Sequence, residues 1–388
     1  MESIFYSSEQ NFFWEKALKQ DSIESSSILA ESFLLVPKSN RKLKKLRFVL
    51  TLEYLYIIKS SNRLQKKKSN ITFGLIEPFV ESDDSSELTG FRVTKKGVFQ
   101  DFYVEKPEVF DHWLSGLQKV CVFGSFFTEL EIVEGLGVGL SADVNLVKDK
   151  GGNFYAAKSI PKSKLLRSKE RIENLKREIL INRQLEHPGL VHLHRVYECE
   201  NFVHLIFDYL DSYDLCESIS SHGRLTEEFT SLIIRKVLST IHYLHAEGVT
   251  HRDIKLENIL VGKNFEVKVI DLGFATKEVG KSRYGSPGYF APEVIQKKPY
   301  NQKADIFSTG VMLYCMLFGD QPFQGDSAEE IISKNLECKV EFPEEEVSEE
   351  AKDLVLKMIE ADPQKRITAA EAMLHPWILK YHNYDYLN

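Results

Sequence analysis

Residues 249–260 read VTHRDIKLENIL, and residues 270–274 read IDLGF. The two stretches set charged and amide side chains among apolar ones: His251, Arg252, Asp253, Lys255, Glu257 and Asn258 in the first, and Asp271 in the second. Burying such groups is costly unless each is paired or binds a metal. A salt-bridged loop on an ordinary helical protein does not explain why Asp, Lys, Asn and Asp occur in this order, whereas phosphoryl transfer does.

Each of these side chains has a task in that chemistry. Asp253 can accept the proton of a substrate hydroxyl, and Lys255 can neutralise charge on the transferred phosphoryl group. Asn258 and Asp271 offer the hard oxygen atoms that Mg²⁺ prefers. The two stretches therefore predict a magnesium-dependent phosphoryl-transfer site.

The bulk composition is that of a soluble globular protein with two or three domains, since 388 residues are 43% hydrophobic and 28% charged. The net charge of −7 disfavours a general nucleic-acid-binding role, and it is uneven, at +2 for residues 1–120 and −9 for residues 121–388. Five cysteines without a C-x-x-C pair indicate reduced thiols. With no secretory signal pattern and no bilayer-length apolar run, we expect a cytoplasmic protein.

The first third of the chain has a strand pattern. Residues 1–26 favour an arm or a short helix around Phe12–Leu18. From Ser27 onward, short alternating apolar runs are separated by polar clusters, which is typical of a small antiparallel β domain. It closes on a helix that starts at Pro107, where apolar residues including Trp113 recur at helical spacing.

The remainder changes character after a partly apolar linker. Residues 131–160 again resemble strands, and the later helical patterns cover residues 162–185, 225–247, 303–318, 326–336, 348–359 and 368–374. We therefore predict an α+β fold in which a β-rich lobe precedes a larger helical one. The predicted divisions are an arm at 1–26, a β domain at 27–121, a linker at 122–130, the two-lobed domain at 131–378 and a tail at 379–388.

Further motifs follow in order around the opening stretches. FYAAKSI ends near Lys158, Glu178 lies 20 residues later in a helical pattern, and SRYGSPGYFAPE closes on Glu293. Asp305 lies in KADIFSTG and Arg366 in DPQKRIT. With these motifs, the chain from about Glu131 to Ile378 resembles a eukaryotic protein kinase.

The resemblance implies roles for particular residues. Asp253 is the catalytic base, Lys255 and Asn258 are further catalytic residues, and Asn258 and Asp271 are the metal ligands, with Leu272 in place of the usual Phe. Lys158 binds phosphate and pairs with Glu178. The residues implied in ATP binding are Leu136, Gly137, Gly139, Val144, Ala156, Lys158, Asp208, Leu210 and Leu260, and Phe207 is the gatekeeper. ATP and Mg²⁺ are thus the expected cofactors.

The phosphate loop departs from the family pattern. In GLGVGLSADV, residues 135–144, Ser141 replaces the usual aromatic at the loop tip and Ala142 replaces the third glycine. Alanine lacks the φ freedom of glycine, while the two glycines nearest the phosphates are kept. We expect ATP to bind, with a less well shielded γ-phosphate.

The kinase class and its control are also implied by resemblance. Lys255 together with Gly285 and Ser286 is similar to serine/threonine kinases, and the whole looks most like the calmodulin-dependent and AMP-activated group. Asp214 and Glu257 favour substrates with basic residues before the target hydroxyl. Arg252 is expected to bind an anion, and the hypothesis is that phosphorylation of Ser282 provides that anion. No calcium loop or calmodulin-binding tail is expected.

The β domain resembles a pleckstrin-homology domain over about residues 27–121. Eleven basic residues lie between Lys38 and Lys68, and Lys45 and Arg47 share one strand face, so Lys38, Lys45 and Arg47 are candidate contacts for a phosphoinositide membrane surface. A solvated basic loop on a protein-binding domain fits equally well. We also hypothesise that this domain restrains the kinase.

Three functions compete on these residues: an active serine/threonine kinase acting on protein substrates, a pseudokinase scaffold, and a lipid-surface adaptor. The first is favoured because Lys158, Glu178, Asp253, Asn258 and Asp271 are all present. A scaffold would be free to lose any of them.

Overall fold

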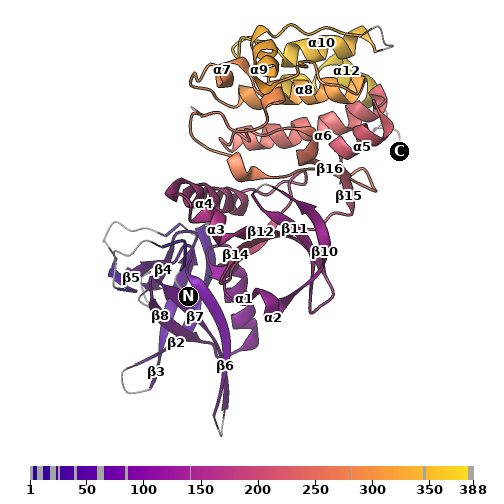
Figure 1. Ribbon diagram of the computed structural model, residues 1–388. Coiled ribbons are helices and arrows are strands. Elements are labelled where there is room, and N and C mark those ends of the chain that lie inside the picture. The colour runs from indigo at the N-terminus through magenta and orange to yellow at the C-terminus, as the bar shows by residue number, and fades with distance from the viewer. Residues whose placement is uncertain are drawn as a thin grey trace. The chain divides into compact units, whose positions relative to one another are not determined.

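The computed structural model describes residues 3–6, 12–17, 23–24, 27–38, 42–58, 65–83, 86–139, 141–280, 282–343 and 347–382. The chain divides into two compact units, which are described separately below. The strand-rich unit comprises Met1–Glu173 and Leu193–Tyr209, and the helical unit comprises Asn174–His192 and Leu210–Asn388. In Figure 1 the arrows gather in the indigo-to-magenta part of the chain, and most coiled ribbons in the pink-to-yellow part.

The strand-rich unit begins with an antiparallel meander. Its strands are β2 (Ile28–Pro37), β3 (Leu43–Thr51), β4 (Tyr54–Ile58), β5 (Gln65–Asn70), β6 (Leu75–Asp83), β7 (Ser86–Lys95) and β8 (Val98–Tyr103). Side-chain alternation places Leu34, Phe48 and Phe102 in the core. Between β7 and β8, Lys96 and Gly97 both have positive φ, as a tight two-residue hairpin turn requires.

A single helix, α1 (Pro107–Gln118), follows the meander. Pro107 occupies the first helical turn, where its missing N–H costs no hydrogen bond. Trp113 is fully buried, and its indole N–H donates to Ser32 Oγ at 2.7 Å. At Gly116 a Cβ would come within 3.3 Å of Ala30, so the glycine lets α1 lie close to β2.

Two stretches differ from their sequence-based expectations. The described part of the N-terminal arm forms β1 (Glu15–Lys16), which pairs with β5, and no helix forms in residues 12–17. The predicted linker contains β9 (Val122–Phe123) and α2 (Phe126–Glu129). Phe123 and Phe126 are buried, because an apolar stretch of this kind is more stable inside the core than as a solvated linker.

The other strands of this unit form the sheet that carries the predicted nucleotide residues. They are β10 (Leu130–Val138), β11 (Asp143–Asp149), β12 (Phe154–Pro161), β13 (Leu193–Glu198) and β14 (Phe202–Asp208). Strand β9 pairs in parallel with both β6 and β13, so the meander and these strands form one continuous sheet. Helices α3 (Lys162–Leu165) and α4 (Lys169–Gln184) follow β12.

The helical unit is built mainly from helices around an apolar core. They are α5 (Leu215–His222), α6 (Glu227–Ala246), α7 (Pro292–Ile295), α8 (Lys303–Phe318), α9 (Ala328–Glu337), α10 (Glu349–Met358), α11 (Ala369–Met373) and α12 (Pro376–His382). The predicted helical ranges from residue 225 onward are confirmed, and α5, α7 and α12 are additional. The predicted range 162–185 is divided into α3 and α4 by a turn at residues 166–168. Hydroxyl side chains cap several N-termini, and Thr368 forms a capping box with Glu371 at α11.

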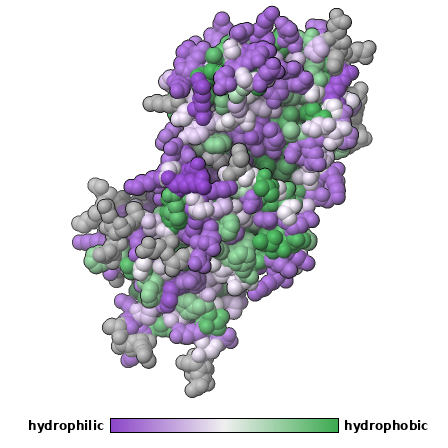
Figure 2. Space-filling model, viewed as in Figure 1, coloured by the Kyte–Doolittle hydropathy of each residue, from purple (hydrophilic) through white to green (hydrophobic). Residues whose placement is uncertain are grey.

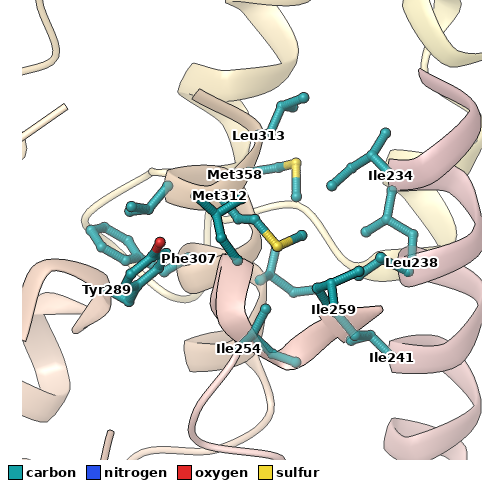
Figure 3. Close-up of a cluster of buried hydrophobic side chains, with 14 of the residues drawn as sticks. Ile234, Leu238, Ile241, Ile254, Ile259, Tyr289, Phe307, Met312, Leu313 and Met358 are labelled. Carbon is teal, nitrogen blue, oxygen red and sulfur yellow. The ribbon is translucent and has the colours of Figure 1, made fainter. Parts of the chain in front are cut away.

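A small sheet and three short 3₁₀ helices carry the site segments of this unit. The sheet contains β15 (Ser212–Asp214), β16 (Ile259–Gly262) and β17 (Val267–Val269). The 3₁₀ helices are η2 (Leu256–Asn258), η3 (Leu272–Phe274) and η4 (Pro287–Tyr289). Figure 3 shows Ile254 and Ile259 pointing into the cluster that also holds Leu238 and Ile241 of α6 and Met312 of α8. The segment between Ile254 and Ile259 is therefore fixed at both ends by burial.

The visible face of the helical unit is mostly hydrophilic, with apolar side chains in scattered spots (Figure 2). Within the described part of the chain, no helix combines the length and the apolar character needed to cross a membrane.

Candidate active site

The predicted site residues are divided between the two units. The strand-rich unit carries Leu136, Gly137, Gly139, Val144, Ala156, Lys158 and Asp208. The helical unit carries Glu178, Leu210, Asp253, Lys255, Asn258, Leu260 and Asp271. The geometry of each set is given within its own unit.

The backbone of the 251–253 turn is held by a buried carboxylate on α8. Asp305 Oδ2 accepts the N–H of His251 at 2.9 Å, and Oδ1 accepts the N–H of Arg252 at 2.8 Å. Arg252 has a φ of 70°, a conformation that persists in a non-glycine residue only where its surroundings hold it. Burial opposes the ionisation of Asp305, but hydrogen bonding and the charge of His245 outweigh it, so its pKa is lowered. Asp305 is thus an anchored acceptor that shapes the turn.

His251 joins this turn to the segment before Asp271. Its Nδ1 accepts the N–H of Asp253 at 3.3 Å, and its Nε2 lies 3.2 Å from the carbonyl oxygen of Ile270. The ring is fully buried. An accepting Nδ1 and a donating Nε2 correspond to the neutral imidazole, so His251 acts as a structural link between the two motifs.

Three polar side chains surround the Asp253 carboxylate. Asn258 Nδ2 donates to the main-chain oxygen of Asp253 at 2.8 Å and to its Oδ2 at 3.1 Å. Lys255 Nζ lies 3.2 Å from the same Oδ2 and 3.1 Å from Ser286 Oγ. The Ser286 hydroxyl in turn donates to Asp253 Oδ1 at 3.4 Å. The catalytic-loop residues predicted from sequence are thus brought together.

The Ser286 contact indicates what the carboxylate can do. A separation of 3.4 Å is long for an O–H···O hydrogen bond, which is usually 2.7–2.8 Å. Asp253 Oδ1 is therefore oriented toward a hydroxyl without a strong bond to it. A substrate hydroxyl can replace this weak contact, and Lys255 lies close enough to stabilise the negative charge that develops there.

The residues proposed as metal ligands fit Mg²⁺. Both Nδ2 protons of Asn258 are directed to Asp253, which leaves its Oδ1 as an oxygen ligand. Asp271 has a φ of 64°, and its Oδ1 accepts the N–H of Gly273 at 3.2 Å. Among the described residues, no three His, Cys, Asp or Glu side chains form a metal cluster. Two protein oxygens suffice for an ion that keeps waters and binds substrate phosphates.

Residues beside Asp271 are placed by the core and by α4. Leu272, which replaces the usual Phe, is buried in the apolar core of the helical unit. Glu178 is also buried, and a methyl group on Gly273 would come within 3.5 Å of its Oε2. The Glu178 carboxylate therefore lies next to the Asp271–Gly273 turn.

The segment that ends in APE is held by a buried ion pair. Arg366 Nη1 and Nη2 donate to the two carboxylate oxygens of Glu293 at 2.6 and 3.0 Å, and both side chains are buried. Gly285 has a φ of 108°, and a Cβ there would lie 2.6 Å from the carbonyl oxygen of Arg252. Only glycine allows this backbone to approach the 251–253 turn.

Arg252 and Ser282 are both in contact with Tyr300, which the sequence did not reveal. The Arg252 guanidinium lies over the Tyr284 ring at 4.6 Å, and its Nε donates to the carbonyl oxygen of Phe274. Tyr300 Oη donates to the carbonyl oxygen of Ser282 at 2.8 Å. Burial raises the pKa of Tyr300 and contact with Arg252 counteracts the rise. No spacing pattern connects Tyr284 or Tyr300 to Arg252, so sequence reasoning could not find them.

In the strand-rich unit, the glycine motif forms the hairpin between β10 and β11. Gly139 N–H donates to the carbonyl oxygen of Ala142 at 2.9 Å, and a Cβ on Gly139 would clash with that oxygen. Gly139 is therefore required by the turn itself. Among the described residues, a Cβ on Gly137 would meet no atom within 4 Å, so the backbone there is open to the close approach of a ligand such as a phosphate.

The other nucleotide-site candidates of this unit lie on neighbouring strands. Val144 of β11 pairs with Lys158 of β12, and Ala156 pairs with Phe207 of β14. The Asp208 side chain binds His194 Nε2 at 2.7 Å. The contact with ATP that is expected of Asp208 would therefore be made by its backbone groups. The register thus places Val144 and Lys158 side by side.

The candidate lipid-binding residues are exposed or partly exposed, and two of them are ion-paired. Lys45 Nζ lies 2.5 Å from Glu105 Oε2, and Arg47 pairs with Glu31. Lys38 is exposed. Of the other basic residues in this cluster, Arg41, Lys59 and Arg63 lie outside the described residues. A phosphate group at Lys45 and Arg47 would have to compete with two carboxylates.

Comparison with known proteins identifies a family for most of the chain. A family model described as the protein kinase domain matches residues 130–378. The chain is 38% identical over 265 residues to the serine/threonine-protein kinase cds1 of Schizosaccharomyces pombe, a match covering 64% of this chain and 58% of that protein. It is 36% identical over 258 residues to the calcium/calmodulin-dependent protein kinase type 1B of Rattus norvegicus, covering 64% and 74%.

A third relative extends the same pattern. The calcium/calmodulin-dependent protein kinase type II alpha chain of Drosophila melanogaster is 36% identical over 264 residues, which cover 65% of this chain and 50% of that protein. The chain thus matches between half and three quarters of the length of these relatives.

Proposed function

The chain belongs to the protein kinase family, and from that premise we propose that it transfers the γ-phosphoryl group of ATP to serine and threonine hydroxyls of proteins in the presence of Mg²⁺. The observation that carries the proposal is the cluster around Asp253. Its carboxylate receives a hydroxyl donor weakly at 3.4 Å while Lys255 and Asn258 hold its other oxygen. A retained general base, cation and amide in this geometry disfavour a scaffold that has lost its chemistry.

Each residue has a distinct role in the proposed reaction. Asp253 orients the substrate hydroxyl and accepts its proton, and Lys255 stabilises the phosphoryl charge. ATP would supply the phosphoryl group, and a bound Mg²⁺ would supply positive charge at its phosphates. Asn258 and Asp271 would hold the metal ion. Lys158 would bind phosphate and pair with Glu178.

The nucleotide base would be bound mainly by apolar side chains. Leu136, Val144, Ala156 and Leu260 are the candidates, and backbone groups of residues 208–210 would bind the adenine edge. The open space beside the Gly137 backbone supports phosphate binding at the hairpin.

A phosphate-incorporation assay tests the proposal. Purified wild-type protein and the Asp253→Asn variant are incubated with Mg²⁺-ATP and a library of serine and threonine peptides. The wild type should incorporate phosphate, and the variant should lose activity by about 10²-fold or more, since it lacks the general base. Equal incorporation by both proteins, or none by the wild type on any peptide, would refute the kinase assignment and leave the scaffold or adaptor.

We propose that the preferred substrates carry basic residues before the target hydroxyl. Glu257 is exposed on η2, and Asp214 accepts the N–H of Glu217 through one carboxylate oxygen. Two carboxylates near the catalytic loop favour cationic peptides. A positional peptide library should show Arg or Lys enrichment upstream of the acceptor in the wild type, reduced in Glu257→Gln.

We propose that phosphorylation of Ser282 activates the enzyme through Arg252. Ser282 is exposed, and the Tyr300 hydroxyl donates to the Ser282 carbonyl oxygen. Tyr300 also contacts Arg252. A phosphate group on Ser282 would offer an anion to the Arg252 guanidinium, which lies over the Tyr284 ring. Ser282→Ala should lower activity in a peptide assay, and full retained turnover would contradict the idea.

For residues 27–121 we propose a pleckstrin-homology-like module that recruits a cytoplasmic kinase to a phosphoinositide surface or to a protein. The meander followed by α1 supports this fold, and the ion pairs of Lys45 and Arg47 favour the protein partner. Loss of liposome co-sedimentation in Lys45→Ala/Arg47→Ala, but not in the control Lys106→Ala, would select the lipid. Unchanged co-sedimentation would exclude it.

We also propose that this module restrains the kinase. Deleting residues 1–121 is a poor test, because it removes β6, the partner of β9, and exposes Phe123 and Phe126. Point variants that leave the sheet intact are better suited.

A further inference from the structure

The junction between the N-terminal module, residues 27–121, and the strands β10–β14 is a rigid one. Phe123 of β9 pairs with Ile76 of β6 on one side and with Tyr197 of β13 on the other. Phe126 of α2 stacks on His204 of β14 at 3.9 Å. Because these contacts are backbone pairing and buried packing within the strand-rich unit, the module is not a freely moving domain on a tether.

An ion-pair cluster reinforces the same junction. Arg195 of β13 donates to Glu129 Oε2 of α2 at 2.7 Å and to Gln118 Oε1, the last residue of α1, at 3.3 Å. Tyr197 Oη donates to the same Glu129 oxygen at 2.7 Å. One arginine of β13 is therefore bonded both to the module's helix and to the segment after it.

The first described residues of the chain cross this junction. Ser3 Oγ donates to Glu198 Oε2 at 2.6 Å, and Ile4 N–H donates to Glu198 Oε1 at 2.7 Å. Phe5 is buried and stacks on Phe73 at 4.7 Å, and Tyr6 Oη donates to the carbonyl oxygen of Thr72 at 2.9 Å. We call residues 3–6 the N-terminal strap, since one end binds β13 and the other binds the module.

Glu198 connects the strap to the strand that carries Lys158. The Glu198 side chain is 2% exposed, and Lys162 Nζ lies 2.8 Å from its Oε1. Lys162 is the first residue of α3, directly after β12, and its N–H donates to the carbonyl oxygen of Asn201. A buried carboxylate is stable only when its partners are in place, so loss of the strap weakens the anchor at the end of β12.

We propose that the N-terminal strap is a built-in regulator of the kinase: bound to Glu198, it fixes the end of β12 and the position of Lys158, and its release loosens both. Negative charge at position 3 is the signal that fits this geometry. A second anion at the Ser3 hydroxyl would face a buried carboxylate at hydrogen-bond distance, where like charges repel strongly. The effect on Lys158 rests on the proposed function, whereas the release of the strap does not.

The test uses the full chain and two independent readouts. Hydrogen–deuterium exchange is followed in peptides covering residues 3–6 and residues 154–165, and the KM for ATP is measured in parallel. The variants are Ser3→Asp, Ser3→Ala and Ser3→Thr, and Glu200→Gln is the matched control for an exposed carboxylate two residues from Glu198.

Ser3→Asp should raise exchange in the strap by about 10-fold or more, as expected when a hydrogen bond to a buried charged group is lost. Ser3→Ala should have a smaller effect, and Ser3→Thr and Glu200→Gln should match the wild type. Ser3→Asp should also raise the KM for ATP with little change in kcat.

The two readouts distinguish the possible failures. Unchanged exchange in Ser3→Asp would overturn the strap itself. Raised exchange with an unchanged KM for ATP would overturn its coupling to Lys158. If the wild type shows no kinase activity, raised exchange in residues 154–165 of Ser3→Asp would still support the coupling of the strap to β12, and unchanged exchange there would refute that coupling.

Discussion

The catalytic loop and the glycine hairpin both carry predicted nucleotide-site residues, yet they are built in opposite ways. The 251–258 segment is held by buried side chains: Asp305 accepts two of its N–H groups, and Ile254 and Ile259 anchor its ends. The hairpin of β10 and β11 is held mainly by backbone pairing, and Gly137 has open space beside it.

The difference indicates where order is present before nucleotide binds. A loop fixed by buried polar groups has its catalytic geometry set in the free protein. A hairpin whose backbone faces open space can adjust around a ligand. We therefore expect substitutions that disturb the anchors of the helical unit to cost more than substitutions in the hairpin.

The largest effect is expected from the buried ion pair of the helical unit. Glu293→Gln leaves the Arg366 guanidinium buried without its countercharge, which should lower the free energy of unfolding by about 3–5 kcal/mol. Urea unfolding followed by circular dichroism measures it. Glu349→Gln, whose side chain is 87% exposed in its pair with Lys352, should leave the midpoint unchanged. A loss below about 1 kcal/mol in Glu293→Gln would show that this pair is not an anchor.

Asp305→Asn tests the anchor of the catalytic loop. An amide can accept only through its oxygen, so one of the two N–H groups of the turn loses its acceptor. The misplaced Asp253 should reduce kcat by about 10²-fold. Steady-state peptide kinetics measure the change, and the exposed Asp326→Asn should behave as the wild type. Wild-type kcat in Asp305→Asn would mean that the loop needs no anchor.

Acid should affect the two units at different pH values. Burial lowers the pKa of His204, in the strand-rich unit, from 6.5 to about 4. The unfolded chain then binds more protons than the folded chain between these values, so stability falls as the pH decreases from about 6.5 toward 4. Asp305 has a lowered pKa, so its contribution is present above its unfolded pKa and is lost only at more acidic pH.

His204→Gln should remove the loss of stability that the wild type shows as the pH decreases from about 6.5 toward 4. At pH 5 the wild type should have lost about 2 kcal/mol relative to neutral pH through this histidine, and the variant should not. Chemical unfolding at pH 7.5, 6 and 5 measures the slope, with the exposed His112→Gln as control. An equal slope in wild type and His204→Gln would place the acid sensitivity elsewhere.

The smallest effect is expected in the hairpin. Ser141→Phe/Ala142→Gly restores the usual family residues, and we expect the KM for ATP to fall by about threefold or less, since the Gly139–Ala142 turn already forms. ATP titration in the peptide assay measures it. A gain approaching 10²-fold would mean that the hairpin, and not the catalytic loop, limits the enzyme.

Much of the fold could be predicted because its signals are local. Alternation identified the strands of the meander, and helical spacing identified α6, α8 and α10. The β5 strand was missed because QKKKSN has no alternation, and β9 because a two-residue strand is defined by its partners β6 and β13. The strap was missed because a polar N-terminus with a few aromatics does not reveal that Glu198 receives it.

The candidate site also contains residues with a local sequence signal and contacts without one. Asp253, Asn258 and Asp271 could be proposed from the sequence because their order along the chain reflects chemistry. The contacts of Ser286, Tyr284 and Tyr300 depend on side chains that approach through space. The ion pairs that occupy Lys45 and Arg47 are likewise set by strand register, with Glu31 and Glu105 on neighbouring elements.

Hydrogen–deuterium exchange of the full chain with and without Mg²⁺-ATP tests the central claim most directly. The amides of His251 and Arg252 should be protected without nucleotide and change little when it binds, whereas those of residues 137–144 should gain protection. Fast exchange of the 251–253 turn in the free protein, with protection appearing only on addition of Mg²⁺-ATP, would contradict the account.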